Sequence, residues 1–245
     1  MPRILTYNVH RCVGTDKKLD VERIVEVIAS FEPDIVALQE LDVRRTRTDM
    51  VDQAHEIALG LEMAVHFHPA MKVEEELYGD AILTRYPERL VQAAPLPGHS
   101  YLSGILEPRG ALWVAVDVDG TQLQIINTHL GLVAREKENQ ANAIAGEAWT
   151  GHPRFRKPGI LLGDFNAAIG SRPYKALARK MRDARTLIHG PKQVTSTFPS
   201  RFAIFEIDHI FVTPGVTVTA LFAPQSPLIR TASDHLPLIM DFDLS

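Results

Sequence analysis

The sequence predicts a layered α/β protein in which two β-sheets pack together and helices cover their outer faces. The chain opens with a strand, a helix and a second strand, an order typical of layered α/β architectures. Many short apolar segments with strand character follow, with few helical ones between them. With 245 residues and 45% hydrophobic residues, the chain can bury a large core, and we expect one domain over residues 1–245.

The first forty residues contain three regular segments. Residues 3–9 alternate in polarity and are rich in β-forming residues, which predicts a strand. Asp20 is a suitable helix N-cap, and the apolar residues after it follow helical spacing up to Pro33. Residues 34–38 form a second apolar strand that runs into Glu40.

The later segments are mostly strands. Asp-Gly at residues 119–120 predicts a hairpin turn between strands over 111–116 and 122–128. A helix over 134–149 carries an apolar stripe that belongs to the core. The other expected segments are a polar loop over 42–49, helix 52–61, strands 63–68, 79–84 and 89–96, a loop over 95–108 bordering a cleft, strand 160–163, helix 173–181, and strands 206–212, 216–222 and 236–243.

Composition and charge exclude several classes of protein. The formal charge of -4 and pI near 6.2 argue against a protein whose affinity depends on neutralising many phosphates. Cys12 is the only cysteine, which rules out an internal disulfide and a cysteine-rich zinc site. The chain starts without the apolar region of a signal peptide, and no later stretch is long enough to span a bilayer. We expect a cytoplasmic protein without an integral membrane segment.

Acidic, amide and imidazole side chains stand at the ends of the predicted strands. Any one of them could be a turn residue or a cap, but so many at the ends of apolar strands imply convergence on one cleft. Asp164 and Asn166 follow one such strand, and a carboxylate and an amide two residues apart can orient a water. The full set is Asn8, Glu40, His129, Asp164, Asn166, Asp208, Asp234 and His235.

This set favours activation of water over a nucleophilic side chain. Ser233, Asp234 and His235 are consecutive, so their side chains alternate in direction and cannot form a hydrolase triad. The sequence also lacks a Gly-x-Ser-x-Gly nucleophile elbow. Oxygen ligands such as Glu40 and Asn8 favour Mg²⁺ or Mn²⁺ over zinc.

Two further features have more than one interpretation. The arginines of the loop over 42–49 could be solvated, or could clamp an anion beside a phosphate site. His66 and His68 could share a strand face and bind a metal, although no third ligand lies near them in the sequence.

Six short motifs, spread over nearly the whole chain, contain the strand-end residues. They are Thr6-Tyr7-Asn8-Val9, Leu38-Gln39-Glu40, Asn127-Thr128-His129-Leu130, Gly163-Asp164-Phe165-Asn166, Ile207-Asp208-His209-Ile210 and Ser233-Asp234-His235. These motifs occur in the order found in the endonuclease/exonuclease/phosphatase superfamily of metal-dependent phosphoesterases, which the chain resembles. The resemblance implies a four-layered α/β/β/α sandwich, with two mostly antiparallel sheets packed face to face, outer helices and the site at one end.

The resemblance also implies roles on the metal and water side of the site. Glu40 would be the principal ligand of a Mg²⁺ or Mn²⁺ ion, with Asn8 as a ligand or orienting group and Asp234 as a further ligand. Asp164 would orient or deprotonate the attacking water. Asn166 would align that water or a phosphate oxygen.

The remaining implied roles concern the phosphorylated substrate. His129 and His235 would stabilise the charge that develops on the phosphoryl group. Asp208 would orient His235 and keep it cationic, because a nearby carboxylate favours the imidazolium form. Substrate binding is expected from Arg45, Tyr78 and Arg109.

The leading hypothesis is a divalent-metal-dependent hydrolase of a phosphodiester or phosphomonoester, with a small-molecule or lipid-headgroup phosphodiesterase favoured. A nuclease acting on DNA or RNA is the alternative within this class, although the net charge does not favour a nucleic acid partner. His10 stands where the abasic-site DNA nucleases of the superfamily carry an acidic residue, which argues against a DNA-repair role. A non-catalytic module that binds a phosphorylated partner is the alternative of a different class.

Overall fold

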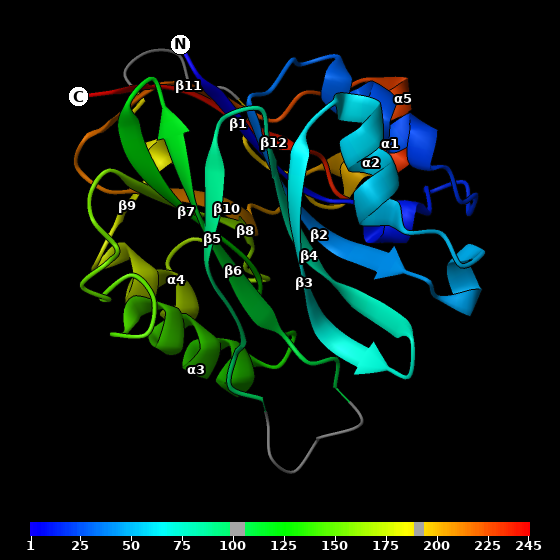
Figure 1. Cartoon of the computed structure of the whole chain (residues 1–245), viewed down its shortest axis with the longest axis horizontal. Coiled ribbons are helices and arrows are strands. Elements are labelled where there is room, and N and C mark those ends of the chain that lie inside the picture. Colours follow the sequence, from blue (N-terminus) through cyan, green and yellow to red (C-terminus); the bar gives the residue numbers. More distant parts are fainter. Residues whose placement is uncertain (99–105, 189–193) are drawn as a thin grey trace.

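The computed structural model describes residues 1–98, 106–188 and 194–245. Their strands form two six-stranded sheets that lie face to face, with helices on the outer sides (Figure 1). The expected sandwich of two mostly antiparallel sheets is therefore confirmed. The middle of the expected cleft-bordering loop, residues 99–105, lies outside the described residues.

The first sheet contains strands from both ends of the chain, in the order β11-β12-β1-β2-β4-β3. Its central pair, β1 and β2, runs parallel, and both strands are almost wholly buried. A strand covered on both faces needs a continuous apolar run, which is the pattern of residues 35–38 at the start of β2. The strands are β1 Arg3–Asn8, β2 Ile35–Val43, β3 Ala64–Val73, β4 Glu76–Thr84, β11 Val216–Phe222 and β12 Leu238–Leu244.

The second sheet has the order β5-β6-β7-β8-β10-β9, again with one parallel pair, β7 and β8. The predicted hairpin is present, because β6 and β7 pair up to Val118 and Thr121 on either side of the Asp119-Gly120 turn. The strands are β5 Glu88–Pro95, β6 Gly110–Val118, β7 Thr121–His129, β8 Gly159–Asp164, β9 Arg182–Asp183 and β10 Asp208–Val212.

Helices α1, α2 and α5 lie together beside the first sheet, and α3 and α4 lie beside the second (Figure 1). The helices are α1 Val21–Ala29, α2 Gln53–Leu61, α3 Ala134–Ala145, α4 Arg172–Ala178 and α5 Pro227–Ala232, and short 3₁₀ turns cover His10–Cys12, Thr46–Thr48, Ala184–Thr186 and Ser200–Phe202. Within the described residues, no helix is long and apolar enough to cross a membrane.

The boundaries of several segments differ from the expectation. The helix expected over 134–149 ends at Ala145, where Gly146 takes an extended conformation. Strand β2 continues to Val43, so the expected polar loop begins later. Helix α5 was not expected. On β3, His66 of the possible metal pair contacts the Glu88 carboxylate of β5.

Buried amide side chains connect the two sheets. Asn127 of β7 donates to the carbonyl oxygens of Leu38 on β2, at 2.9 Å, and of Ala81 on β4, at 2.8 Å. Its own amide oxygen accepts from Gln39 Nε2 at 2.8 Å. Polar groups buried in an apolar interface are costly unless paired, so these bonds specify how the sheets are aligned.

Candidate active site

Side chains from both sheets meet at the ends of β1, β7 and β8 and the start of β10, beside the middle of β2. The amide of Asn8, the last residue of β1, donates to Glu40 Oε1 and to Asp164 Oδ2, each at 3.0 Å. Glu40 belongs to β2 in the same sheet as Asn8, whereas Asp164 ends β8 in the other sheet. One amide therefore ties together the two sheets and two carboxylates of the site.

A β-bulge places Glu40. Leu38 pairs with Ala81 and Leu41 with Gly79, so Gln39 and Glu40 together face the single residue Asp80. Glu40 has a φ of 61°, which is unusual for a residue other than glycine and often marks a functional position. The bulge lets Gln39 bond across the sheet interface while Glu40 reaches Asn8.

Gly163 allows Asp164 to lie beside His129. A Cβ atom on Gly163 would lie 1.9 Å from the carbonyl oxygen of Thr128, and the φ of Gly163 is 139°. Only glycine fits this close approach of β8 to β7. The next residues in the parallel register are His129 and Asp164, and His129 Nε2 lies 3.5 Å from Asp164 Oδ2.

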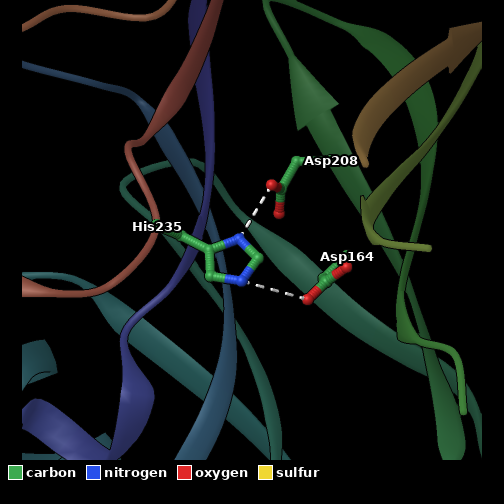
Figure 2. Close-up of side chains that lie close together, drawn as sticks. All are labelled: Asp164, Asp208 and His235. Carbon is green, nitrogen blue, oxygen red and sulfur yellow. Dashed lines mark hydrogen bonds and ion pairs between the residues drawn. The ribbon is translucent and has the colours of Figure 1, made fainter. Parts of the chain in front are cut away.

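His235 lies between two buried carboxylates (Figure 2). Its Nδ1 is 2.9 Å from Asp208 Oδ2, and its Nε2 is 3.6 Å from Asp164 Oδ2. Burial disfavours the charged imidazole, but Asp208 and Asp164 outweigh it and raise the pKa of His235 to about 10. Burial and the negative charge of Asp208 raise the pKa of Asp164 as well. His235 is therefore cationic at neutral pH.

His129, unlike His235, is uncharged. Burial, Arg109 and His235 lower the pKa of His129 well below its ordinary value, so the ring is neutral at pH 7. Its Nε2 lies 3.1 Å from Asn166 Nδ2, which also donates to the carbonyl oxygen of Leu130 at 3.0 Å. The backbone N–H of Asn166 donates to Asp164 Oδ1 at 2.8 Å. These contacts hold Asn166 between the Asp164 carboxylate and the neutral ring of His129.

The expected substrate-binding residues differ in their surroundings. Arg109 is buried, and its Nη1 lies 3.3 Å from Glu107 Oε2, while its Nε has no hydrogen-bond partner among the residues that the structure describes. Arg45 lies 3.4 Å from Glu76 and 3.9 Å from Asp42, so two carboxylates already neutralise it. The buried ring of Tyr78 lies beneath the Arg47 guanidinium, 5.5 Å from it.

Asp234 lies at the border of the site. Its side chain is 39% exposed, and Asp234 Oδ1 is 3.7 Å from His10 Nδ1 and 3.4 Å from Ser233 Oγ. Seven of the eight strand-end residues are thus joined by direct contacts among themselves, whereas the carboxylate of Asp234 contacts His10 and Ser233.

Several supporting residues were missed by sequence reasoning. Thr197 donates its hydroxyl to Asp208 Oδ2 at 2.5 Å, and Arg185 donates to the Asp208 carbonyl oxygen at 2.8 Å. Lys137 donates to the carbonyl oxygen of Asn166. His209 Nε2 lies 2.7 Å from the carbonyl oxygen of Ala167. Among these supporting residues, only His209 belongs to one of the six sequence motifs. The others lie far from their partners in the sequence and belong to no pattern.

The fold and the site define a class of protein: a four-layered α/β sandwich with acidic, amide and imidazole groups gathered between its two sheets. The chain belongs to the endonuclease/exonuclease/phosphatase family, whose model matches residues 5–235. This family includes phosphatases, nucleases and phosphodiesterases and generally hydrolyses phosphoester bonds. No curated protein matches the chain.

Solved structures share the fold over the whole chain. A family member from Beutenbergia cavernae DSM 12333 is 24% identical with a TM-score of 0.78, and the match covers 100% of this chain and 72% of that one. The mannosyl-6-phosphatase Bt3783 of Bacteroides thetaiotaomicron VPI-5482 is 19% identical, with a TM-score of 0.77 and 100% of both chains covered. The human Nocturnin catalytic domain with bound sulfate is 22% identical with a TM-score of 0.73, covering 100% of this chain and 94% of that one.

Enzymes of this family commonly depend on a divalent metal, and two groups of residues here have suitable atoms. Asp164, Asp208 and His235 are close enough to hold an ion. His235 Nδ1, however, is already engaged by Asp208 Oδ2 at 2.9 Å, and its Nε2 faces Asp164 at 3.6 Å. Glu40 and Asn8 offer only oxygen atoms, the ligands that Mg²⁺ and Mn²⁺ prefer, and thus fit such an ion better.

Proposed function

We propose that the protein is a divalent-metal-dependent phosphoesterase that hydrolyses a phosphodiester or phosphomonoester by attack of an activated water. The observation that carries this proposal is the cationic His235 held between Asp208 and Asp164 beside the oxygen ligands Glu40 and Asn8. Such a site offers positive charge to a phosphoryl group and a carboxylate to water. Two structural neighbours point the same way, since one is a mannosyl-6-phosphatase and another binds sulfate, an anion shaped like phosphate.

Glu40 and Asn8 would hold the metal ion. The side-chain amide of Asn8 donates its N–H groups to Glu40 and Asp164, which leaves its Oδ1 for the ion. Asn8 Oδ1 also accepts from the backbone N–H of His10 at 3.0 Å. A bound Mg²⁺ or Mn²⁺ would polarise a phosphate oxygen and offset the charge of the substrate. Asp234 would add a further ligand from the border of the site.

Asp164 would accept the proton of the attacking water. Its raised pKa brings its basicity closer to neutral pH, where a general base works best. The backbone N–H of Asn166 fixes Asp164 Oδ1, and the Asn166 amide lies on the same side of the cluster as His129. Asn166 would therefore align the water or a phosphate oxygen.

His235 would stabilise the negative charge that develops on the phosphoryl group. Asp208 holds the ring by its Nδ1, so His235 Nε2–H is the donor available to the substrate. His129 is neutral and would contribute through its dipole and hydrogen bonds alone. Arg109 and Tyr78 would bind the substrate next to this group, and Arg45 would do so only in exchange for its present carboxylate partners.

The substrate is proposed to be a small-molecule or lipid-headgroup phosphodiester. The net charge of -4 supports this class over a nucleic acid, since binding to a polyanion depends on many Lys and Arg contacts. Hydrolysis of DNA or RNA that weakens steeply with salt would favour a nuclease instead.

A metal-by-substrate screen tests the proposal. Bis-p-nitrophenyl phosphate, phospholipids, inositol phosphates and nucleic acids would be incubated with Mg²⁺, Mn²⁺ or EDTA. We expect turnover that EDTA abolishes, and a loss of about 10²–10⁴-fold in kcat for Asp164→Asn. Glu40→Gln should weaken Mn²⁺ binding, measured by calorimetry, as well as turnover.

Glu22→Gln is the matched control for these variants, because Glu22 is an exposed carboxylate on α1. It should keep full turnover, and all three variants should keep the circular dichroism of the wild type. The proposal is wrong if the wild type turns over no phosphoester with any divalent ion. It is also wrong if both Asp164→Asn and Glu40→Gln retain wild-type turnover.

A further inference from the structure

An ordered loop beside His235 displays large apolar side chains to solvent. Phe202, Ile204 and Phe205 are 80%, 69% and 50% exposed. Single exposed apolar residues are common on protein surfaces, but three within four positions form a patch that costs free energy in water and usually has a binding role. We call residues 198–205 the apolar loop.

The exposure of these side chains does not come from a frayed segment. Phe198 and Phe205 exchange backbone hydrogen bonds of 3.3 and 2.9 Å, which closes the loop at its base. Ser200 is buried and its hydroxyl donates to the carbonyl oxygen of Arg230 at 3.1 Å. A 3₁₀ turn over Ser200–Phe202 forms the tip. The fold thus holds apolar groups outward on a fixed support.

The base of the apolar loop is built into the candidate active site. The ring of Phe198 lies 4.8 Å from the His235 ring, centroid to centroid. The backbone N–H of Ser200 donates to the carbonyl oxygen of Asp234 at 2.7 Å. Whatever the tip contacts is therefore held close to the imidazolium that would face the phosphoryl group.

Positive charge accompanies the apolar tip. Arg201 is exposed between Ser200 and Phe202, and its Nη2 donates to the carbonyl oxygen of Thr15 at 3.1 Å. Lys17 and Lys18 are exposed on the same turn as Thr15. Asp16, which lies between Thr15 and Lys17, is paired with Arg23 at 2.9 Å. Apolar side chains flanked by cations match a lipid surface with anionic headgroups.

Other apolar residues near the site extend this pattern. Leu132 and Ile169 are exposed, and each follows a site residue by three positions, His129 and Asn166 respectively. The two segments are joined, because Asn166 Nδ2 donates to the carbonyl oxygen of Leu130. The segments that follow His129 and Asn166 therefore also present aliphatic groups to solvent.

We propose that the apolar loop docks the protein on a bilayer that contains anionic phospholipid. Phe202, Ile204 and Phe205 enter the interface, and Arg201 lies at the level of the lipid phosphates. Docking brings lipid headgroups to His235 and Asp164, so the proposal rests on the proposed function for its substrate but not for the binding itself.

Sedimentation with vesicles tests the docking without any need for turnover. The full chain would be mixed with vesicles of phosphatidylcholine, alone or with phosphatidylglycerol. We expect binding that is stronger with phosphatidylglycerol, and a loss of about tenfold in the partition coefficient for Phe202→Ser or Ile204→Ser, as expected when one large apolar side chain no longer leaves water. Arg201→Gln should weaken binding only to the mixed vesicles.

Leu59→Ser is the matched control, because Leu59 on α2 is 66% exposed and carries an equally large aliphatic group. It should bind vesicles like the wild type. Glu40→Gln should also bind normally, so a protein without phosphoesterase activity can still dock, and the two proposals fail separately. Absence of wild-type binding, or an equal loss in Leu59→Ser, overturns the docking. A dimer in sedimentation velocity that Phe202→Ser abolishes, without vesicle binding, identifies a second copy as the partner and also overturns it.

Discussion

Replacing Asn127 by alanine tests whether the buried amides between the sheets hold the fold together. The Asn127 amide makes three buried hydrogen bonds, to Leu38, Ala81 and Gln39, at 2.9, 2.8 and 2.8 Å. Asn127→Ala removes all three. At about 1 kcal/mol net for each bond, the free energy of unfolding should fall by about 3 kcal/mol. For a chain of this size, the Tm should then fall by roughly 6–12 °C.

Urea unfolding followed by circular dichroism measures this change. The midpoint should fall while the slope with denaturant stays the same, because the unfolded state exposes the same surface. Asn142→Ala is the control, since Asn142 is exposed on α3, and its stability should change by less than about 0.5 kcal/mol. A loss below about 1 kcal/mol for Asn127→Ala would show that the carbonyl oxygens find other partners and would refute the reasoning.

Three further substitutions probe the site and its support. Asp208→Asn removes the charge that keeps His235 protonated. The kcat for bis-p-nitrophenyl phosphate should therefore fall by about 10²–10⁴-fold, and activity should be lost at a lower pH than in the wild type, because the His235 ring loses its proton earlier. An unchanged pH profile would contradict this. Gly163→Ala should lower stability by about 1–3 kcal/mol or more in urea unfolding, and by more than Gly170→Ala, because both have positive φ but only Gly163 meets a backbone oxygen. Burial raises the pKa of Asp183, but His209 and Arg185 outweigh it and lower the pKa overall. Because the pKa of Asp183 in the folded state lies below the unfolded value of about 3.9, the ionised carboxylate stabilises the fold above about pH 4. This stabilisation is lost as the pH falls through the folded-state pKa. Asp183→Asn should therefore cost most stability at neutral pH in urea titrations, and the cost should shrink as the pH falls below about 4. A cost independent of pH would argue against the ion pairs of Asp183 with Arg185, at 3.6 Å, and His209, at 3.5 Å.

The strands along the chain were predictable because the sequence patterns that mark them are local. Apolar runs such as 35–38 and the Asp119-Gly120 turn act within a few residues of chain. The boundaries depend on distant partners instead. Asp42 looks like a loop residue in the sequence, yet it is buried in β2 and accepts two hydrogen bonds from Arg47. Helix α5 is six residues long and begins with Pro227, too short to show a helical period.

The candidate site was predictable as a set of residues, and the cationic His235 was expected, but the charge state of His129 and the pairing of Arg45 were not. Polar residues at the ends of apolar strands identified Asn8, Glu40 and Asp164, which are now seen in contact. The charge of a side chain depends on burial and on neighbours from elsewhere in the chain. His129 is neutral for this reason, and Arg45 is engaged by Glu76 of the next hairpin. Catalytic roles for these residues stay predictions.

The bulge in β2 makes Glu40 an extra residue in its strand. Strand pairing resumes on both sides of Glu40, at Leu38 and Leu41, and the ladder would be regular with one residue fewer. The proposed metal ligand is thus a residue that the sheet does not need. Deleting it would leave a flatter, simpler strand without the proposed ligand, whereas an unrelated two-sheet protein could acquire an acid at its sheet junction by inserting a single codon.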